Sequence, residues 1–306
     1  MNRFFIISNR ILTLSILISL FLSSCNSGGR GAKKEADSLS VSETNAAIYD
    51  DIKKAETIFY TIPSPLESAM LIKSAGAVFD EKLLNPVGNT NNYNTNKSMA
   101  LNLGIYTCDL SFASLYDQTQ LIINYMNAAK KMADGLGILE AIGDEDINQL
   151  EQNIHNTDVI MEIVSKTYLN SNSYLEDNGQ PAIAAIVLTG GWMEGLYIST
   201  QLVDMNDFNG NKLVGRIIDQ KLSVDILINL LEESKGNPAI DELLTEVNKI
   251  KAVFDKITLK TTPVRPEYDQ MANVTVLKSE VQSDLTPEIF KELSGKVAEI
   301  RSSFIR

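Results

Sequence analysis

The sequence is poor in the residues that most catalytic and metal centres need. Among its 306 residues it has one histidine, His155, and two cysteines, Cys25 and Cys108. A Ser–His–Asp triad would have to use His155, and no G-x-S-x-G motif supports one. Zinc sites built from cysteine, H-E-x-x-H sites and di-metal helical bundles need more of these ligands than the chain has. We therefore expect no metal site and no cofactor.

Basic residues are also scarce. The chain has 27 Lys and Arg against 39 Asp and Glu, a net charge of −12. A nucleic-acid-binding protein needs a basic face for the phosphates, so the composition argues against a nucleic-acid partner. The glycine patterns G-x-G-x-x-G and G-x-x-x-x-G-K-[ST] are absent as well, which argues against a nucleotide-binding loop.

The first 25 residues have the order of parts of an export signal. Arg3 and Arg10 make a positive start, and the apolar run 11–22 is shorter than the roughly 20 residues of a membrane span. The tetrad Leu22-Ser23-Ser24-Cys25 follows, with small residues before a cleavage point. Removal of residues 1–24, which contain two arginines and no acid, would bring the net charge from −12 to −14.

This tetrad resembles the lipobox of bacterial lipoproteins. The resemblance implies that residues 1–24 are a lipoprotein signal peptide and that Cys25 becomes the lipidated first residue of the mature chain. Lipidation would make a membrane surface the first partner, and it would leave Cys108 without an intramolecular disulfide partner. An ordinary secretory signal is the alternative.

The mature chain also resembles, diffusely over roughly residues 46–260, helical lipoproteins of Bacteroidota to which no activity is assigned. That resemblance implies the cell envelope, lipid-anchored at the outer membrane, and leaves the leaflet open. This resemblance implies no catalytic residue in the present chain.

The remaining sequence predicts an all-α protein. Residues 25–44 are small, polar and charged, which is typical of a flexible tether. Residues 45–306 read as one helical domain, an antiparallel multi-helix bundle with short loops. The stretch 258–284 alternates and holds two prolines, so we expect an irregular or hairpin excursion there.

One helix, residues 182–203, is apolar on all sides and carries a single charge, Glu194. Its length would allow a membrane span, but a carboxylate at mid-span is costly in lipid, so a central bundle helix is favoured. Gly191, Gly195 and Ser199 recur every four residues, as do Ala100, Gly104 and Cys108. We expect the two helices that carry these stripes of small residues to cross closely.

The candidate site follows from two acids among apolar neighbours, Asp109 and Glu194. A buried carboxylate costs several kcal/mol, by order of magnitude, unless it is paired or neutral. One interpretation is that each acid is hydrogen-bonded within the core, and the sequence favours it. The other is that both acids line an interhelical pocket with Tyr106, Trp192 and Tyr197 and bind a ligand or shuttle a proton.

A second candidate is the polar loop at residues 85–96, where Asn92 and Asn94 flank Tyr93. Amides beside an aromatic ring suit a sugar or a peptide, although asparagine is also a common turn former. The first functional hypothesis is therefore a lipid-anchored envelope protein with a helical binding or scaffold domain for a small ligand or an envelope protein. The alternatives are an enzyme that uses Asp109 or Glu194 as general acid or base, for which the chain offers no nucleophile, and a purely structural lipoprotein.

Overall fold

Proline and small polar caps set the helix starts in this chain. In the computed structural model, which describes residues 62–261, 265–269, 274–278 and 281–306, proline is the first residue of α2, α8, α10 and α11. At α2 the Ser64 Oγ accepts from the Glu67 amide at 3.2 Å, and the Glu67 carboxylate accepts from the Ser64 amide at 2.8 Å. This reciprocal capping satisfies amides that have no partner within the helix.

The α-helices run, in chain order, over α2 (Pro65–Ser74), α3 (Asn96–Leu115), α4 (Thr119–Gly135), α5 (Leu139–Ile142), α6 (Asp144–Gln152), α7 (Thr157–Asp177), α8 (Pro181–Gln201), α9 (Lys212–Glu233), α10 (Pro238–Phe254) and α11 (Pro287–Phe304). Three short 3-10 helices lie between them within the described residues, η1 (Glu81–Leu83), η2 (Val87–Asn91) and η3 (Met205–Asp207). The all-α class predicted from the sequence is confirmed. The predicted signal, the tether and Cys25 lie outside the described residues.

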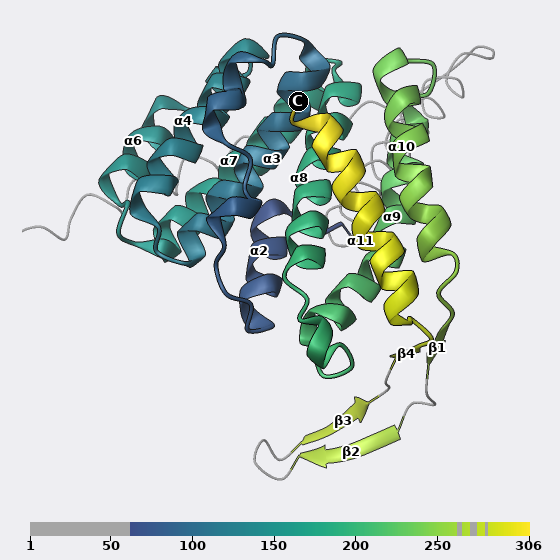
Figure 1. Cartoon of the computed structure of the whole chain (residues 1–306). Helices are drawn as coiled ribbons and strands as arrows, with labels where there is room; N and C mark the ends of the chain where they lie inside the picture. The colour runs from purple at the N-terminus through teal and green to yellow at the C-terminus, as the bar shows by residue number, and fades with distance from the viewer. Residues whose placement is uncertain (1–61, 262–264, 270–273, 279–280) are drawn as a thin grey trace, which may run out of the picture. The chain divides into compact units, whose positions relative to one another are not determined.

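Helix α8 lies at the centre of the bundle (Figure 1). It packs against α3 most extensively and also contacts α2, α7, α9 and α11. It is long and apolar enough to cross a membrane by composition, but 78% of its apolar window is buried inside the protein. That burial is what a core helix of a bundle has, and the surrounding helices supply the apolar contacts that lipid would otherwise supply.

Glycines let α3 and α8 approach each other closely. A Cβ at Gly104 would collide with the carbonyl oxygen of Val187 and would lie 2.6 Å from the Gly191 nitrogen. The predicted close crossing is therefore confirmed for Gly104 and Gly191. Gly190, which lies outside the predicted stripe, meets the Leu101 carbonyl, whereas Gly195 faces Ser68 of α2.

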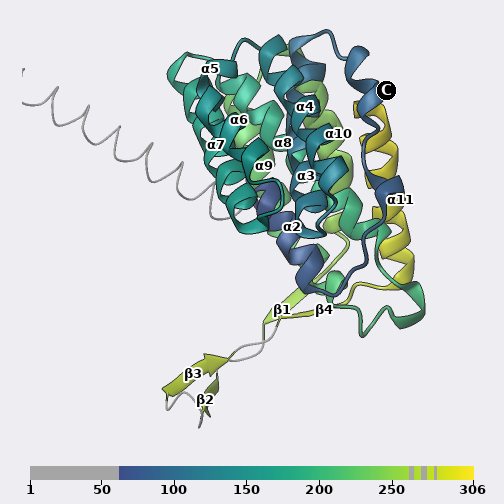
Figure 2. The same cartoon turned by 90° about the vertical axis from the view of Figure 1, so that its left-hand side faces the viewer.

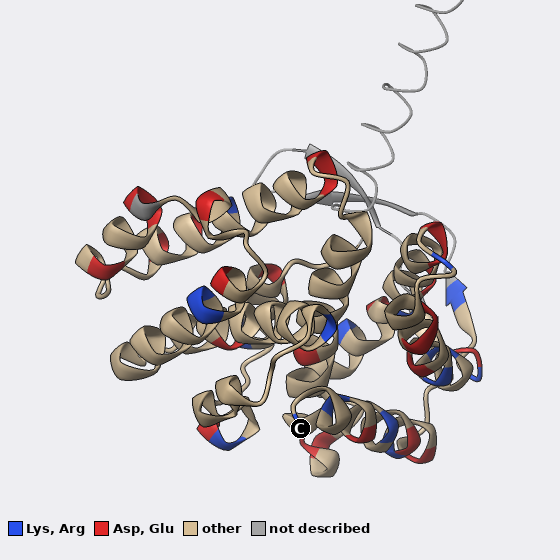
Figure 3. Cartoon of the chain, turned by 90° about the horizontal axis from the view of Figure 1, so that it is seen from above, with Lys and Arg blue, Asp and Glu red and all other residues tan. Residues whose placement is uncertain are grey.

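Helices α4, α5, α6 and α7 form a layer beside α3 (Figure 2). Helices α5 and α6 contact α7 and each other, and two glycines with positive φ, Gly137 (+71°) and Gly143 (+75°), bracket α5. Positive φ is cheap for glycine and lets the chain turn sharply there. Within the described residues, acidic and basic positions are interleaved on the outer helices and the central helices are nearly free of charge (Figure 3).

The excursion near residues 258–284 is an extended antiparallel hairpin, as predicted. Strand β1 (Leu259–Thr261) pairs with β4 (Val281–Ser283), and β2 (Arg265–Asp269) pairs with β3 (Val274–Lys278). In the first pair Leu259 is opposite Ser283, and in the second Arg265 is opposite Lys278. The hairpin connects α10 to α11.

Candidate functional site

Glu194, the single charge of α8, is completely buried and bonded to an arginine of the last helix. The Nε and Nη2 of Arg301 donate to the two carboxylate oxygens of Glu194 at 2.8 and 2.6 Å. Arg301 is only 5% exposed, and its guanidinium also donates to the Leu83 carbonyl at 3.0 Å and stacks 4.5 Å from the Tyr197 ring centre. A bidentate arginine–carboxylate pair has the geometry that best offsets the free-energy cost of removing two charges from water.

Asp109 of α3 lies beside this pair and is also completely buried. Its Oδ2 accepts from the Asn85 amide at 3.0 Å, and its Oδ1 has no donor. Burial, the repulsion of Glu194 and a hydrogen bond to that carboxylate raise the pKa of Asp109 well above its usual range. Burial therefore favours the neutral form of Asp109, and Glu194 is the acid that pairs with Arg301.

Polar groups from the asparagine loop complete this buried network. The Asn85 side-chain amide donates to Tyr93 Oη at 3.0 Å and to Asn102 Oδ1 at 2.9 Å. Asn102 in turn donates to the Phe304 carbonyl at 3.0 Å, and Tyr93 Oη donates to the Ile305 carbonyl at 3.0 Å. The network therefore fastens the end of α11 to α3 and to the loop, which is an architectural role.

The structure brings together some of the residues that the sequence proposed for a pocket, and separates others. Asp109, Glu194 and Tyr197 meet around Arg301. Tyr106 is buried next to Tyr93 and donates from its hydroxyl to the Pro86 carbonyl at 3.2 Å. The remaining member, Trp192, donates from Nε1 to Gln220 of α9 at 3.0 Å and belongs to another helix contact.

The asparagine loop does not present its aromatic ring. Tyr93 is 5% exposed and points inward, whereas Asn92 and Asn94 are exposed. The three side chains therefore do not share a surface on which a sugar or a peptide could stack. The reason is the hydrogen bond of the Tyr93 hydroxyl to the end of α11, which draws the ring into the core.

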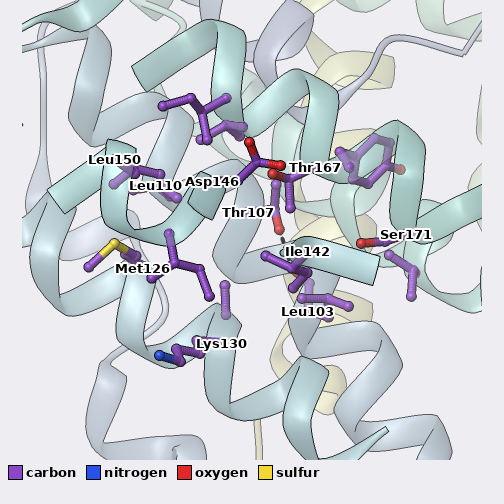
Figure 4. Close-up of a pocket in the computed structure, with 16 residues that line it drawn as sticks. Leu103, Thr107, Leu110, Met126, Lys130, Ile142, Asp146, Leu150, Thr167 and Ser171 are labelled. Atoms are coloured by element: carbon purple, nitrogen blue, oxygen red, sulfur yellow. Dashed lines mark hydrogen bonds between the residues drawn. The ribbon is translucent and has the colours of Figure 1, made fainter. Parts of the chain in front are cut away.

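A second site, a cavity of about 70 Å³, lies between α3, α4, α5, α6 and α7, with Val187 of α8 also in its wall (Figure 4). Its walls are mostly apolar and include Leu103 and Leu110 of α3, Met126 of α4, Leu150 of α6 and Ile163 of α7. Protein interiors are close-packed, so an apolar void of this size leaves its walls without contacts that a ligand could supply.

Two buried hydroxyl oxygens at this cavity have no hydrogen-bond partner. Thr167 and Tyr168 both line it, and neither Thr167 Oγ1 nor Tyr168 Oη is bonded. By contrast, the hydroxyl of Thr107 in the same wall donates to the Leu103 carbonyl at 2.7 Å. A buried polar group without a hydrogen-bond partner lowers the stability of the fold by about 1–3 kcal/mol. The hydroxyls of Thr167 and Tyr168 therefore destabilise the fold unless a further group bonds them, whereas that of Thr107 does not.

The rim of the cavity carries one ion pair and one further cation. Asp146 of α6, which lines the cavity, accepts from Lys166 of α7 at 2.8 Å, and the side chain of Asp146 is 11% exposed. Lys130 of α4 also lines the cavity, but its amine points away from the other labelled side chains (Figure 4). The interior wall is therefore close to neutral.

A larger cleft of about 520 Å³ lies between the start of α3, α10 and the end of α11. Four of its charged side chains pair with each other: Lys97 with Glu242 at 2.5 Å, and Lys249 with Glu246 at 2.7 Å. Because these four side chains already have partners within the protein, the cleft is a weaker candidate for a ligand site than the apolar cavity.

Sequence reasoning missed Arg301, Asn85 and the cavity. Arg301 had a readable signal, because it follows Ile300 in the apolar stripe of α11 formed by Phe290, Leu293, Val297 and Phe304. A lone arginine in such a stripe predicts a buried acidic partner. Thr167 had none, because a threonine on the face of an amphipathic helix is unremarkable in sequence.

Neither metal ligands among the described residues nor similarity to a known protein points to a particular function. Within the described ranges, no group of three or more His, Cys, Asp and Glu side chains could hold a metal ion. Comparisons of the chain with protein-family models, with curated proteins and with solved structures found no match.

Proposed function

We propose that this protein is a lipid-anchored protein of the cell envelope whose helical domain binds a small ligand in the cavity between α3 and α7. The observation that carries the binding role is an apolar cavity in whose wall Thr167 Oγ1 is buried and unbonded. Apolar concave sites with a few polar groups are the usual form of small-ligand sites. A ligand would fill the void and give the hydroxyl a partner.

The anchoring role is supported by the sequence order of Arg3, Arg10, the apolar run and Cys25. Its test is metabolic labelling with a palmitate analogue. Label should appear on the native chain and vanish in Cys25→Ser. Cys108→Ser, which changes the buried cysteine, is the matched control and should keep the label. Labelling that survives Cys25→Ser would contradict the anchor.

Two observations count against the enzyme alternative. Asp109 and Glu194 are both 0% exposed, so a substrate could reach them only if α11 moved away. Glu194 is also committed to Arg301 by two hydrogen bonds, and the charge of a general base must be free to take a proton. A purely structural lipoprotein would have the same network but no use for the cavity.

Xenon tests the binding role, because it occupies apolar cavities without needing polar contacts. The described helices all lie after residue 61, so a chain that begins at residue 26 keeps every one of them. Crystals of this chain under xenon pressure should show a xenon atom between α3 and α7. Ala129 lines the cavity, and Ala129→Leu should fill it and exclude the gas.

The matched control is Ala252→Leu, which adds the same group at an exposed position of α10 and should leave xenon binding unchanged. A cavity that takes no xenon in the native chain, or that takes it equally in Ala129→Leu, would overturn the binding role.

A further inference from the structure

We infer that the ligand of this cavity is an uncharged molecule with a short apolar body and a single hydroxyl or carbonyl group that hydrogen-bonds Thr167. This inference rests on the proposed binding role. It deepens that role, because it names the chemical class of the ligand from the size of the cavity, the charge of its wall and one of its two unbonded hydroxyls, that of Thr167.

Size limits the apolar part. The cavity measures about 70 Å³, whereas an engineered apolar cavity of roughly 150 Å³ accepts benzene. A ligand seated here therefore has an apolar body of a few carbons, or it inserts only the end of a longer chain. Drug-sized ligands occupy pockets of about 300–1,000 Å³, which is several times the volume of this cavity.

The wall disfavours a charged ligand. Asp146 is the one carboxylate among the lining residues, and Lys166 already neutralises it. The Lys130 amine is turned away from the cavity (Figure 4). A carboxylate or an ammonium group placed inside would lose its hydration without gaining a partner of opposite charge, which costs far more than burying a hydroxyl.

Thr167 provides the polar contact. Its Oγ1 is buried and unbonded, so it can donate one hydrogen bond to a ligand oxygen or accept one from a ligand hydroxyl. Thr107 has no proton left to donate to a ligand, because its hydroxyl already donates to the Leu103 carbonyl. The two threonines line the same cavity and differ in this one respect, so they form a natural pair for a test.

The probes are three four-carbon molecules, 1-butanol, butyrate and butylammonium, measured by ligand-observed NMR with the chain that begins at residue 26. We expect 1-butanol to bind and each ion to bind at least tenfold more weakly. Thr167→Val, which keeps the shape and removes the hydroxyl, should raise the Kd for 1-butanol roughly tenfold, the effect of losing one hydrogen bond. Thr107→Val should leave that Kd within about twofold of the native value.

The outcomes separate this inference from the binding role beneath it. If xenon binds but Thr167→Val leaves the 1-butanol Kd unchanged, the polar contact is wrong. If butyrate or butylammonium binds as tightly as 1-butanol, the uncharged class is wrong. In both cases the cavity is still a binding site. If neither xenon nor 1-butanol binds, the binding role itself is wrong. It is also wrong if Ala129→Leu leaves the binding of both xenon and 1-butanol unchanged.

Discussion

Arg301 on the last helix and Glu194 on the central helix are joined by two hydrogen bonds of 2.8 and 2.6 Å, although 107 positions separate them in the chain. Both side chains are buried, and the pair is the point at which α11 is fastened to α8. The one charged residue of α8 is therefore paired, inside the bundle, with a partner from the far end of the sequence.

Arg301→Met should destabilise the protein strongly, because it leaves the Glu194 carboxylate buried without its partner. Breaking one side of a buried pair costs about 3–5 kcal/mol. The measurement is the free energy of unfolding in urea, with the chain that begins at residue 26. Adding Glu194→Met to the same chain should recover a large part of the loss, because the unpaired charge is then gone.

The control is Arg216→Met, which breaks a pair with Asp219 whose side chains are 51% and 58% exposed. Exposed pairs contribute about 0–1 kcal/mol, so this variant should unfold almost as the native chain does. Equal losses for Arg301→Met and Arg216→Met would contradict the architectural role of the buried pair.

Asp109→Asn should stabilise the protein near neutral pH. The pKa of Asp109 is raised in the folded state, mainly by burial, so the folded chain binds more protons than the unfolded chain once the pH exceeds the unfolded pKa. Stability from this group is therefore complete below the unfolded pKa of about 3.9 and falls as the pH rises toward the folded pKa. The slope of this loss is at most about 1.4 kcal/mol per pH unit.

An asparagine there resembles the protonated acid and does not titrate, so the difference between native and variant should widen from pH 4 upward. Urea unfolding at several pH values measures it, with Asp134→Asn at an exposed position of α4 as the control. A variant that is less stable than the native chain at pH 7, with no change in the pH slope, would show that Asp109 is ionised in the fold.

Gly104→Ala should force α3 and α8 apart, because the added Cβ would collide with the Val187 carbonyl oxygen. Overpacking of this kind costs about 1–3 kcal/mol, and more where backbone must move. Gly215→Ala in α9 is the matched control, since nothing lies within 4 Å of its added Cβ, and it should be neutral or gain up to about 1 kcal/mol of helix stability. The comparison is read from thermal unfolding, and a Gly104→Ala chain as stable as Gly215→Ala would refute the close crossing.

Lys166→Met should increase the mobility of α5 and α6, which form part of the cavity wall. Asp146 and Lys166 join α6 to α7, and the segment between Gly137 and Gly143 has the backbone freedom of two glycines with positive φ. Hydrogen exchange of α5 and α6 should accelerate in Lys166→Met, and high salt should produce a weaker version of the same effect in the native chain. Lys296→Met, which breaks the exposed pair with Glu299 within α11, should leave exchange in α5 and α6 unchanged.

The parts that could be predicted from the sequence are those that depend on local spacing. The crossing of α3 and α8 follows from small residues four positions apart, and the buried acids stand out because their neighbours are apolar. The lone arginine of the α11 stripe indicates a buried acidic partner, but spacing within a helix does not say whether Glu194 or Asp109 lies against it. The cavity could not be predicted either, since it forms where side chains from six helices, α3 to α8, leave space between them.

We propose two separate roles: the Glu194–Arg301 network holds the fold, and the cavity binds a small ligand. The most direct test measures the free energy of unfolding and the Kd for 1-butanol in two variants, Arg301→Met and Thr167→Val. We predict that Arg301→Met loses about 3–5 kcal/mol of stability and, under conditions where it is folded, keeps its Kd. Thr167→Val should keep or gain stability and bind roughly tenfold more weakly. If Arg301→Met instead abolishes binding while the protein stays stable, or Thr167→Val changes neither quantity, the assignment of the two roles is contradicted.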